Sequence, residues 1–168
     1  DLLKIRELDL SGKGLSDLSP LAGVTGVKSL YLNDNPVSDL APLSGLKWLL
    51  TLSLNRCQIV NLRPLQNLDG LVYLNLDNNQ ISDLTSVASL KKLEILGLSG
   101  NEVTDLTPLA GLTKLEELFL QGNKIPDITP LAELTGLEEL YLEANQITDL
   151  TPLAALTQVT SLNLHTNQ

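Results

Sequence analysis

Hydrophobic residues recur along this chain with a fixed period of 22 residues and without a single insertion. In each unit two leucines flank one outward position, as Leu118 and Leu120 do, and an asparagine follows three residues after the second leucine. This alternation predicts a short strand with one buried face. Because the units repeat in register, we expect the strands to stack about 4.8 Å apart in one parallel sheet.

The full unit is L-x-x-L-x-L-x-x-N-x-I-x-D-L-x-P-L-A-x-L-x-x, which carries the leucine-rich-repeat signature. It predicts an α/β fold, a right-handed curved solenoid with the parallel sheet on its concave face and short 3-10 turns on its convex face. The units make one domain over residues 1–168, with seven full repeats, a half repeat and no evident capping domain.

One asparagine per unit is expected to turn inward, because a buried amide is tolerated only when it is hydrogen-bonded. Its partners would be backbone groups of its own loop and of the next coil. Cys57 takes this place in one unit, where a buried structural thiol is favoured over a reactive one. Lys13 takes it in the first unit and predicts an irregular coil there. The asparagines are Asn35, Asn79, Asn101, Asn123, Asn145 and Asn167.

The second half of the unit predicts a short helical turn that opens on an aspartate and carries a proline three residues later. An N-cap carboxylate binds free N–H groups, and an early proline needs no N–H partner. Asn61 and Ser86 are compatible replacements. Calcium between stacked aspartates is the alternative to capping, and capping is favoured. The aspartates are Asp17, Asp39, Asp83, Asp105, Asp127 and Asp149, and the prolines are Pro20, Pro42, Pro64, Pro108, Pro130 and Pro152.

The net charge of −9 and the pI near 4.4 argue against binding to nucleic acid or to an anionic membrane surface. They favour a protein partner with a basic or mixed-charge surface. No apolar run has the length of a membrane span. The only histidine, His165, has no second metal ligand near it in sequence, and no nucleotide-binding glycine motif occurs. We therefore predict no catalytic residue, no metal and no cofactor.

The register assigns the outward strand positions, and four of the five aromatic residues fall there. Aromatic side chains are typical binding anchors, although they also favour strands for packing reasons alone. One predicted zone is aromatic with an acidic rim and contains Glu117, Phe119, Gln121, Glu139, Tyr141 and Glu143. The second is more polar and contains Tyr31, Asn33, Asn55, Arg56, Tyr73, Asn75 and Asp77.

The fifth aromatic residue, Trp48, precedes the first leucine of its unit in the loop that leads to the strand. We predict that it packs on the flank of the solenoid rather than contacting a partner.

The segment DLTPLAGLTKLEELFLQGNKI, residues 105–125, closely resembles the 22-residue repeat of internalins, the leucine-rich surface proteins of Gram-positive bacteria. The resemblance covers essentially the whole chain and implies binding of a protein through the concave sheet. It also implies a secreted or cell-surface location in bacteria, with a cytoplasmic one left open. The helical cap and the immunoglobulin-like region of internalins have no counterpart here.

These observations favour a non-catalytic protein-interaction module. One alternative is a structural spacer whose bare coil ends associate end to end with other copies, because a solenoid exposes core leucines and a strand edge at an uncovered end. Another is a sensor or recruiting arm of a larger enzyme. Because the chain starts inside a coil and ends midway through a unit, we expect it to be a fragment of a longer protein.

Overall fold

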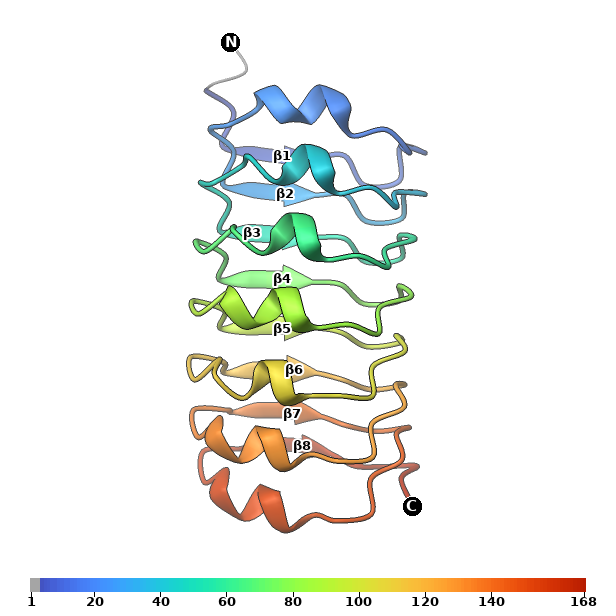
Figure 1. The fold of residues 1–168 in the computed structure, drawn as a ribbon, viewed down its shortest axis with the longest axis vertical. Coiled ribbons are helices and arrows are strands. Elements are labelled where there is room, and N and C mark those ends of the chain that lie inside the picture. Colours follow the sequence, from blue (N-terminus) through green and yellow to red (C-terminus); the bar gives the residue numbers. More distant parts are fainter. Residues whose placement is uncertain (1–3) are drawn as a thin grey trace.

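The computed structural model describes residues 4–168 as a stack of coils with the sheet on one side and short helical turns on the other (Figure 1). Within these residues eight parallel strands form one sheet in chain order, so the first and last described coils lie at opposite ends of the stack. The strands are β1 (Glu7–Asp9), β2 (Ser29–Tyr31), β3 (Thr51–Ser53), β4 (Tyr73–Asn75), β5 (Ile95–Gly97), β6 (Glu117–Phe119), β7 (Glu139–Tyr141) and β8 (Ser161–Asn163).

Each strand pairs with its neighbours at an offset of one repeat, so that Leu118 lies beside Leu96 and Leu140. The predicted leucine-rich-repeat fold and the register of its strands are therefore confirmed. The central leucines of β2 to β7 are buried and form one continuous core with the leucines of the turns. On the last strand, Leu162 remains 46% exposed, because none of the described residues packs beyond it.

The turns on the opposite side are 3-10 helices, and the proline stands in their first two positions in every one except η5, which has Ser86 there. Each turn from η2 to η7 buries one leucine or valine against the core. The turns are η2 (Ser19–Gly23), η3 (Ala41–Leu43), η4 (Arg63–Leu65), η5 (Thr85–Ser89), η6 (Thr107–Leu109), η7 (Thr129–Glu133) and η8 (Thr151–Ala155).

The aspartate of each unit stabilises its turn, but one residue earlier than predicted. Leu106, and not Asp105, occupies the N-cap of η6, and its apolar side chain makes no capping bond. The Asp105 carboxylate instead accepts the N–H of Thr107 at 2.8 Å in an Asx turn. The N-cap prediction is wrong, because the residue at the N-cap is Leu106, whose side chain is buried in the core. The same two-residue bond recurs at Asp17, Asp39, Asn61, Asp83, Asp127 and Asp149.

The asparagine ladder is the main polar feature of the interior. The Asn123 amide nitrogen donates to the carbonyl oxygens of Leu120 and Leu98, both at 2.9 Å. Its Oδ1 accepts the N–H of Val103 at 2.9 Å. Leu98 and Val103 belong to the preceding coil, so the prediction of a link to the next coil had the direction wrong. The side chain closes its own loop and fastens it to the coil before it.

Cys57 is buried, as predicted, and its Sγ lies 3.4 Å from the Leu32 carbonyl oxygen that an asparagine would bind. A thiol offers no oxygen acceptor, so the N–H of Val37 turns to the Asn35 carbonyl oxygen at 2.8 Å instead. Burial raises the pKa of the Cys57 thiol, as is typical of a structural cysteine. The thiol thus replaces only part of the ladder.

The first coil is irregular, as the lysine in its ladder position predicts. Lys13 is exposed, and the glycines on both sides of it have left-handed backbones, with φ of 64° at Gly12 and 69° at Gly14. A second left-handed residue at the place of Gly14 occurs in no other described coil. The loop therefore follows another path where the buried amide is missing.

Every coil also places a left-handed residue directly before the ladder position, a feature that the sequence analysis did not predict. Glycine avoids the steric cost of this conformation, whereas other L-residues lose about 1–2 kcal/mol. Ala144 adopts φ of 55° without any compensating side-chain group. The residues are Gly12, Asp34, Arg56, Asn78, Gly100, Gly122, Ala144 and Thr166.

Asn123→Ala is expected to lower the free energy of unfolding by roughly 3 kcal/mol or more, because two buried carbonyls and one N–H lose their partner. Cys57→Ala, at the equivalent position, removes one weak bond and should cost about 1 kcal/mol. Urea denaturation measures both. Equal losses in the two variants would contradict the role assigned to the buried amide.

Ala144→Gly is expected to raise the free energy of unfolding by about 0.5–1 kcal/mol, because glycine relieves the left-handed strain. The control is Ala110→Gly, since Ala110 has a right-handed backbone with φ of −52°. That change should lower stability by about 0.5–1 kcal/mol. Thermal unfolding of both variants checks the opposite signs, and destabilisation by Ala144→Gly would show that the backbone there carries no strain.

Candidate functional site

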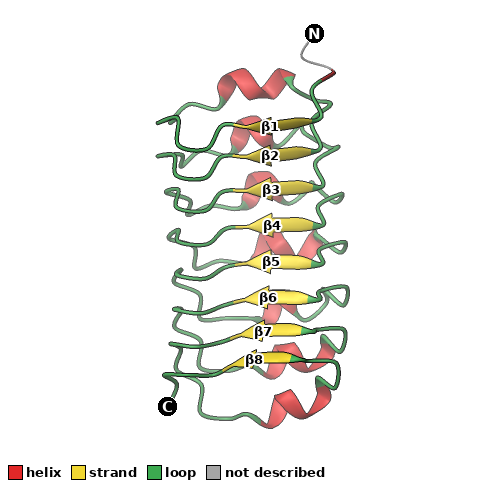
Figure 2. Ribbon diagram, turned by 180° about the vertical axis from the view of Figure 1, so that it is seen from behind, coloured by secondary structure: helices red, strands yellow, loops and turns green. Residues whose placement is uncertain are grey.

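The eight strands lie side by side on one face of the described structure (Figure 2). Their outward positions form three columns, two with one residue from each strand and a third with the second residue after each strand. The pairing register places Phe119 between Gly97 and Tyr141 in the middle column. The middle column contains Asp9, Tyr31, Ser53, Asn75, Gly97, Phe119, Tyr141 and Asn163. This is the face that the sequence assigns to binding, and its register is as expected.

Phe119 and Tyr141 form a stacked aromatic pair at neighbouring rungs. Their ring centroids are 5.1 Å apart and their planes differ by 13°. The Tyr141 hydroxyl lies 2.9 Å from Ser161 Oγ and donates to Glu139 Oε2 at 3.3 Å. Because parallel in-register strands fix both backbones, the pair is a preorganised apolar platform that remains partly open to solvent.

Carboxylates border this platform on both sides, with Glu117 and Glu139 in the column before it and Glu143 in the column after it. Burial raises the pKa of the Glu117 carboxyl. The neighbouring carboxylates of Glu139, Glu116 and Glu138 raise it further. Like charges held together on a rigid sheet favour a cationic group beside them, since such a group removes the repulsion.

Two side-chain oxygens beside the platform lack a hydrogen-bond donor among residues 4–168. They are Gln121 Oε1 and Glu143 Oε2, which belong to the third column at the rungs of Phe119 and Tyr141. Both atoms are shielded from solvent in the free chain. A buried acceptor without a donor is costly, and because neither atom is open to solvent, a ligand could reach it only after the side chain turns outward.

The second predicted zone is organised differently, because its polar side chains are occupied by the backbone. Asn33 Oδ1 accepts the N–H of Asn55 at 2.8 Å, and Asn75 Oδ1 accepts the N–H of Asp77 at 2.9 Å. Asp77 Oδ1 in turn accepts the N–H of Ser99 at 2.7 Å. Burial raises the pKa of Asp77, and the bond from Ser99 opposes that rise. These side chains brace the loops after the strands.

The remaining residues of this zone do not come together as one cluster. Tyr31 and Tyr73 stand in different columns with β3 between their strands, and no ring contact between them occurs in the described structure. Arg56 lies beyond its strand at a left-handed position, and its guanidinium pairs with Asp34 at 3.7 Å. The zone is a polar network with separate tyrosines, whereas Phe119 and Tyr141 form a single platform.

Gly97 separates the two zones, and its importance was missed in the sequence analysis. A Cβ atom at this position would lie 2.9 Å from Asp77 Oδ1 and 3.3 Å from the Asn75 side chain. The glycine is therefore required by the network of the polar zone. It also leaves Phe119 without a side-chain neighbour in the middle column on the β5 side. The signal in the sequence is one glycine in a column of larger residues.

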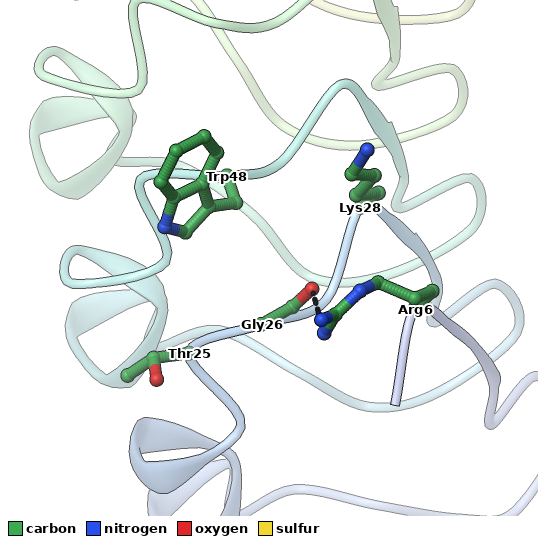
Figure 3. A pocket seen from close by; sticks show the side chains of 5 residues that line it. All are labelled: Arg6, Thr25, Gly26, Lys28 and Trp48. Carbon is green, nitrogen blue, oxygen red and sulfur yellow. Dashed lines mark hydrogen bonds between the residues drawn. The ribbon is translucent and has the colours of Figure 1, made fainter. Parts of the chain in front are cut away.

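Trp48 does not pack on the flank, and that prediction is wrong: the residue is 67% exposed. The equivalent positions in the coils before and after it are Gly26 and Gly70, which offer the indole no side chain to pack against. Trp48 instead lines a shallow pocket of about 320 Å³ together with Arg6 and Lys28 (Figure 3).

Residues 4–168 contain no group of three or more His, Cys, Asp or Glu side chains placed to hold a metal ion. Among the helices of the described chain, none is long and apolar enough to cross a membrane.

Comparisons with known proteins agree with this architecture. The family model described as "Leucine-rich repeat region" matches residues 26–168. No relative was found among curated proteins.

Two solved structures from Listeria monocytogenes str. 4b F2365 are similar to the chain. Internalin InlF is 41% identical with a TM-score of 0.97, and the match covers 99% of this chain and 49% of that one. Internalin C2 is 41% identical with a TM-score of 0.93, and the match covers 95% of this chain and 70% of that one. The chain thus spans about half the length of the InlF chain. It belongs to the leucine-rich-repeat proteins and is of the bacterial, internalin-like type.

Proposed function

We propose that this chain is a non-catalytic protein-binding module that holds its partner on the outer face of the sheet. The stacked pair of Phe119 and Tyr141 within a rim of glutamates carries the proposal. A rigid apolar platform supplies contact area at low entropic cost, and hot spots of interfaces are enriched in such aromatic groups. The likeness to internalins supports the same mode of binding and a secreted or surface location.

The partner is expected to present a basic or mixed-charge surface to the platform. Glu117, Glu139 and Glu143 surround the rings, and few basic side chains lie on the neighbouring rungs. A lysine or arginine placed here would interact with both the carboxylates and the ring faces. The polar zone around Asn33, Asn75 and Asp77 would then form the rim of the contact, since its side chains are already engaged with the backbone.

Selection of a displayed library of random peptides on the immobilised chain tests this proposal. We expect the recovered peptides to be enriched in lysine and arginine. The double variant Phe119→Ala/Tyr141→Ala should weaken their binding by at least about 2 kcal/mol, as expected of hot-spot residues. Circular dichroism and thermal unfolding should remain close to those of the wild type, because both side chains lie outside the leucine core.

Val60→Ala is the matched control, because Val60 is an exposed apolar residue outside the sheet. It should leave peptide binding unchanged. Peptides that bind the double variant as tightly as the wild type would refute the platform as the binding site.

A further inference from the structure

We propose that the flank of the solenoid carries a second binding surface, which takes a short acidic and apolar segment of a protein partner. The surface centres on Trp48, a large side chain that the core does not use, and on the hollow of about 320 Å³ beside it. The hollow is lined by Arg6, Thr25, Gly26, Lys28 and Trp48 (Figure 3).

The hollow has an aromatic wall and a cationic wall. The Trp48 indole stands on one side, and the side chains of Arg6 and Lys28 stand on the other (Figure 3). The backbone at Gly26 lies between the two walls and has no side chain to fill the space. The Arg6 guanidinium donates to the Gly26 carbonyl oxygen at 3.1 Å, which fixes the guanidinium beside that backbone. Lys28 is exposed to solvent.

The positive charge around this hollow is unusual on a chain that carries −9. The described loops that lead into β1, β2 and β3 also contain Lys4 and Lys47, and they contain no carboxylate. The carboxylates next to these loops are Glu7, the first residue of β1, and Asp69, which lines a separate hollow with Lys47. Neither of them lines the hollow at Trp48. An anionic group is therefore favoured there.

Apolar surface continues from the hollow along the flank. Of the described residues before position 150, three large hydrophobic ones are exposed, and two of these, Trp48 and Leu50, belong to the same loop. Leu50 reaches over the next coil, since a Cβ atom at Gly70 would lie 3.9 Å from its Cδ2 atom. The half-buried Val72 follows in that coil. Single exposed apolar residues are common, but neighbouring ones beside a hollow mark an interaction surface.

The chemistry of the lining favours a peptide over other anionic ligands. A saccharide needs hydrogen-bond acceptors as well as donors, whereas the lining side chains include no amide and no carboxylate. A nucleic acid or an anionic membrane needs a broad basic surface, which this acidic chain does not present. A peptide with a carboxylate next to an apolar side chain fits both walls, and tryptophan and arginine are frequent hot-spot residues for such contacts.

The extent of the surface sets the length of this segment. From Arg6, before β1, to Val72, before β4, the surface crosses three steps between neighbouring strands, or about 15 Å. An extended segment of about five residues covers that span. Its acidic residues are expected at Arg6 and Lys28, and its apolar residues at Trp48 and Leu50. The surface lies outside the sheet and has the opposite charge to the aromatic platform, so neither proposal depends on the other.

Titration of the chain with blocked hexapeptides tests the proposal, because Trp48 is the only tryptophan and its emission reports on this surface alone. The probes are Gly-Asp-Asp-Leu-Leu-Gly and the same peptide in reverse order. We expect at least one of them to move the emission to shorter wavelength along a saturable curve. Its analogue with asparagine in place of aspartate should bind about tenfold more weakly or worse, because it lacks the charge-assisted hydrogen bonds.

Three outcomes of this titration overturn the proposal. The first is an emission that neither acidic peptide changes in a saturable way. The second is an asparagine analogue that binds as tightly as the acidic peptide. The third is saturable binding of an oligomer of galacturonic acid at the concentrations that saturate the peptide site, which would assign the hollow to an acidic saccharide instead.

Charge reversal shows whether the peptide uses the cationic wall. Lys28→Glu should weaken binding of the acidic peptide by about tenfold or more, because it sets like charges together. Lys114→Glu is the matched control, since it makes the same change of charge at an exposed site three coils beyond Trp48. It should alter binding by less than about twofold in 0.1 M salt, where the screening length is about 10 Å. Equal losses in the two variants would overturn the assignment to the hollow.

Two further variants separate this surface from the sheet. Trp48→Ala should abolish binding of the acidic peptide, as measured by calorimetry. Phe119→Ala/Tyr141→Ala should bind that peptide as the wild type does, even if the platform fails its own test. Circular dichroism should show that the flank variants are folded, because Lys28, Trp48 and Lys114 are exposed. Unchanged binding by Trp48→Ala would overturn the role of the aromatic wall.

Discussion

The ladder asparagine amide that recurs in six of the eight coils is the interaction on which the rest of this structure depends. A coil of 22 residues must turn its backbone inward after each strand, which leaves carbonyl and N–H groups without water. One side chain with a donor and an acceptor at fixed spacing satisfies groups of its own coil and of the preceding one. Since the same link recurs along the stack, every strand takes the same register as the last.

A fixed register separates the side chains that build the fold from those that are free to vary. The inward leucines and most of the ladder asparagines repeat from coil to coil, while the set of three outward residues changes from rung to rung. The stacking of Phe119 on Tyr141 follows from this arrangement, because two residues 22 positions apart become neighbours on a rigid sheet. Residues that differ between repeats therefore lie side by side on one surface of the sheet.

Sequence reasoning recovered the features that depend on this repeat, namely the strands, their order and the outward columns. It placed the capping aspartates one residue late, because the pattern does not show that the buried leucine after each aspartate occupies the cap. It missed the left-handed position before the ladder residue, since arginine, alanine and threonine occur there as well as glycine. Because these residue types share no backbone preference, the sequence does not show that this position is left-handed in every coil.

Other features required contacts that no single repeat contains. From the sequence, Asn33, Asn75 and Asp77 are exposed polar groups, but in the structure Asn33 and Asp77 accept backbone N–H groups of the next coil and Asn75 accepts one of its own coil. The exposure of Trp48 depends on glycines one repeat away on either side, a signal that appears only when the flank is read as a column.

The most direct test of the binding surface uses the fact that Phe119 is the only phenylalanine in the chain. Incorporation of fluorinated phenylalanine therefore places one fluorine signal on the aromatic platform. Titration with a basic peptide that binds the chain should shift this signal with the same saturation curve as binding itself. A fluorine signal that does not move while the peptide binds would contradict the claim that the platform forms the binding surface.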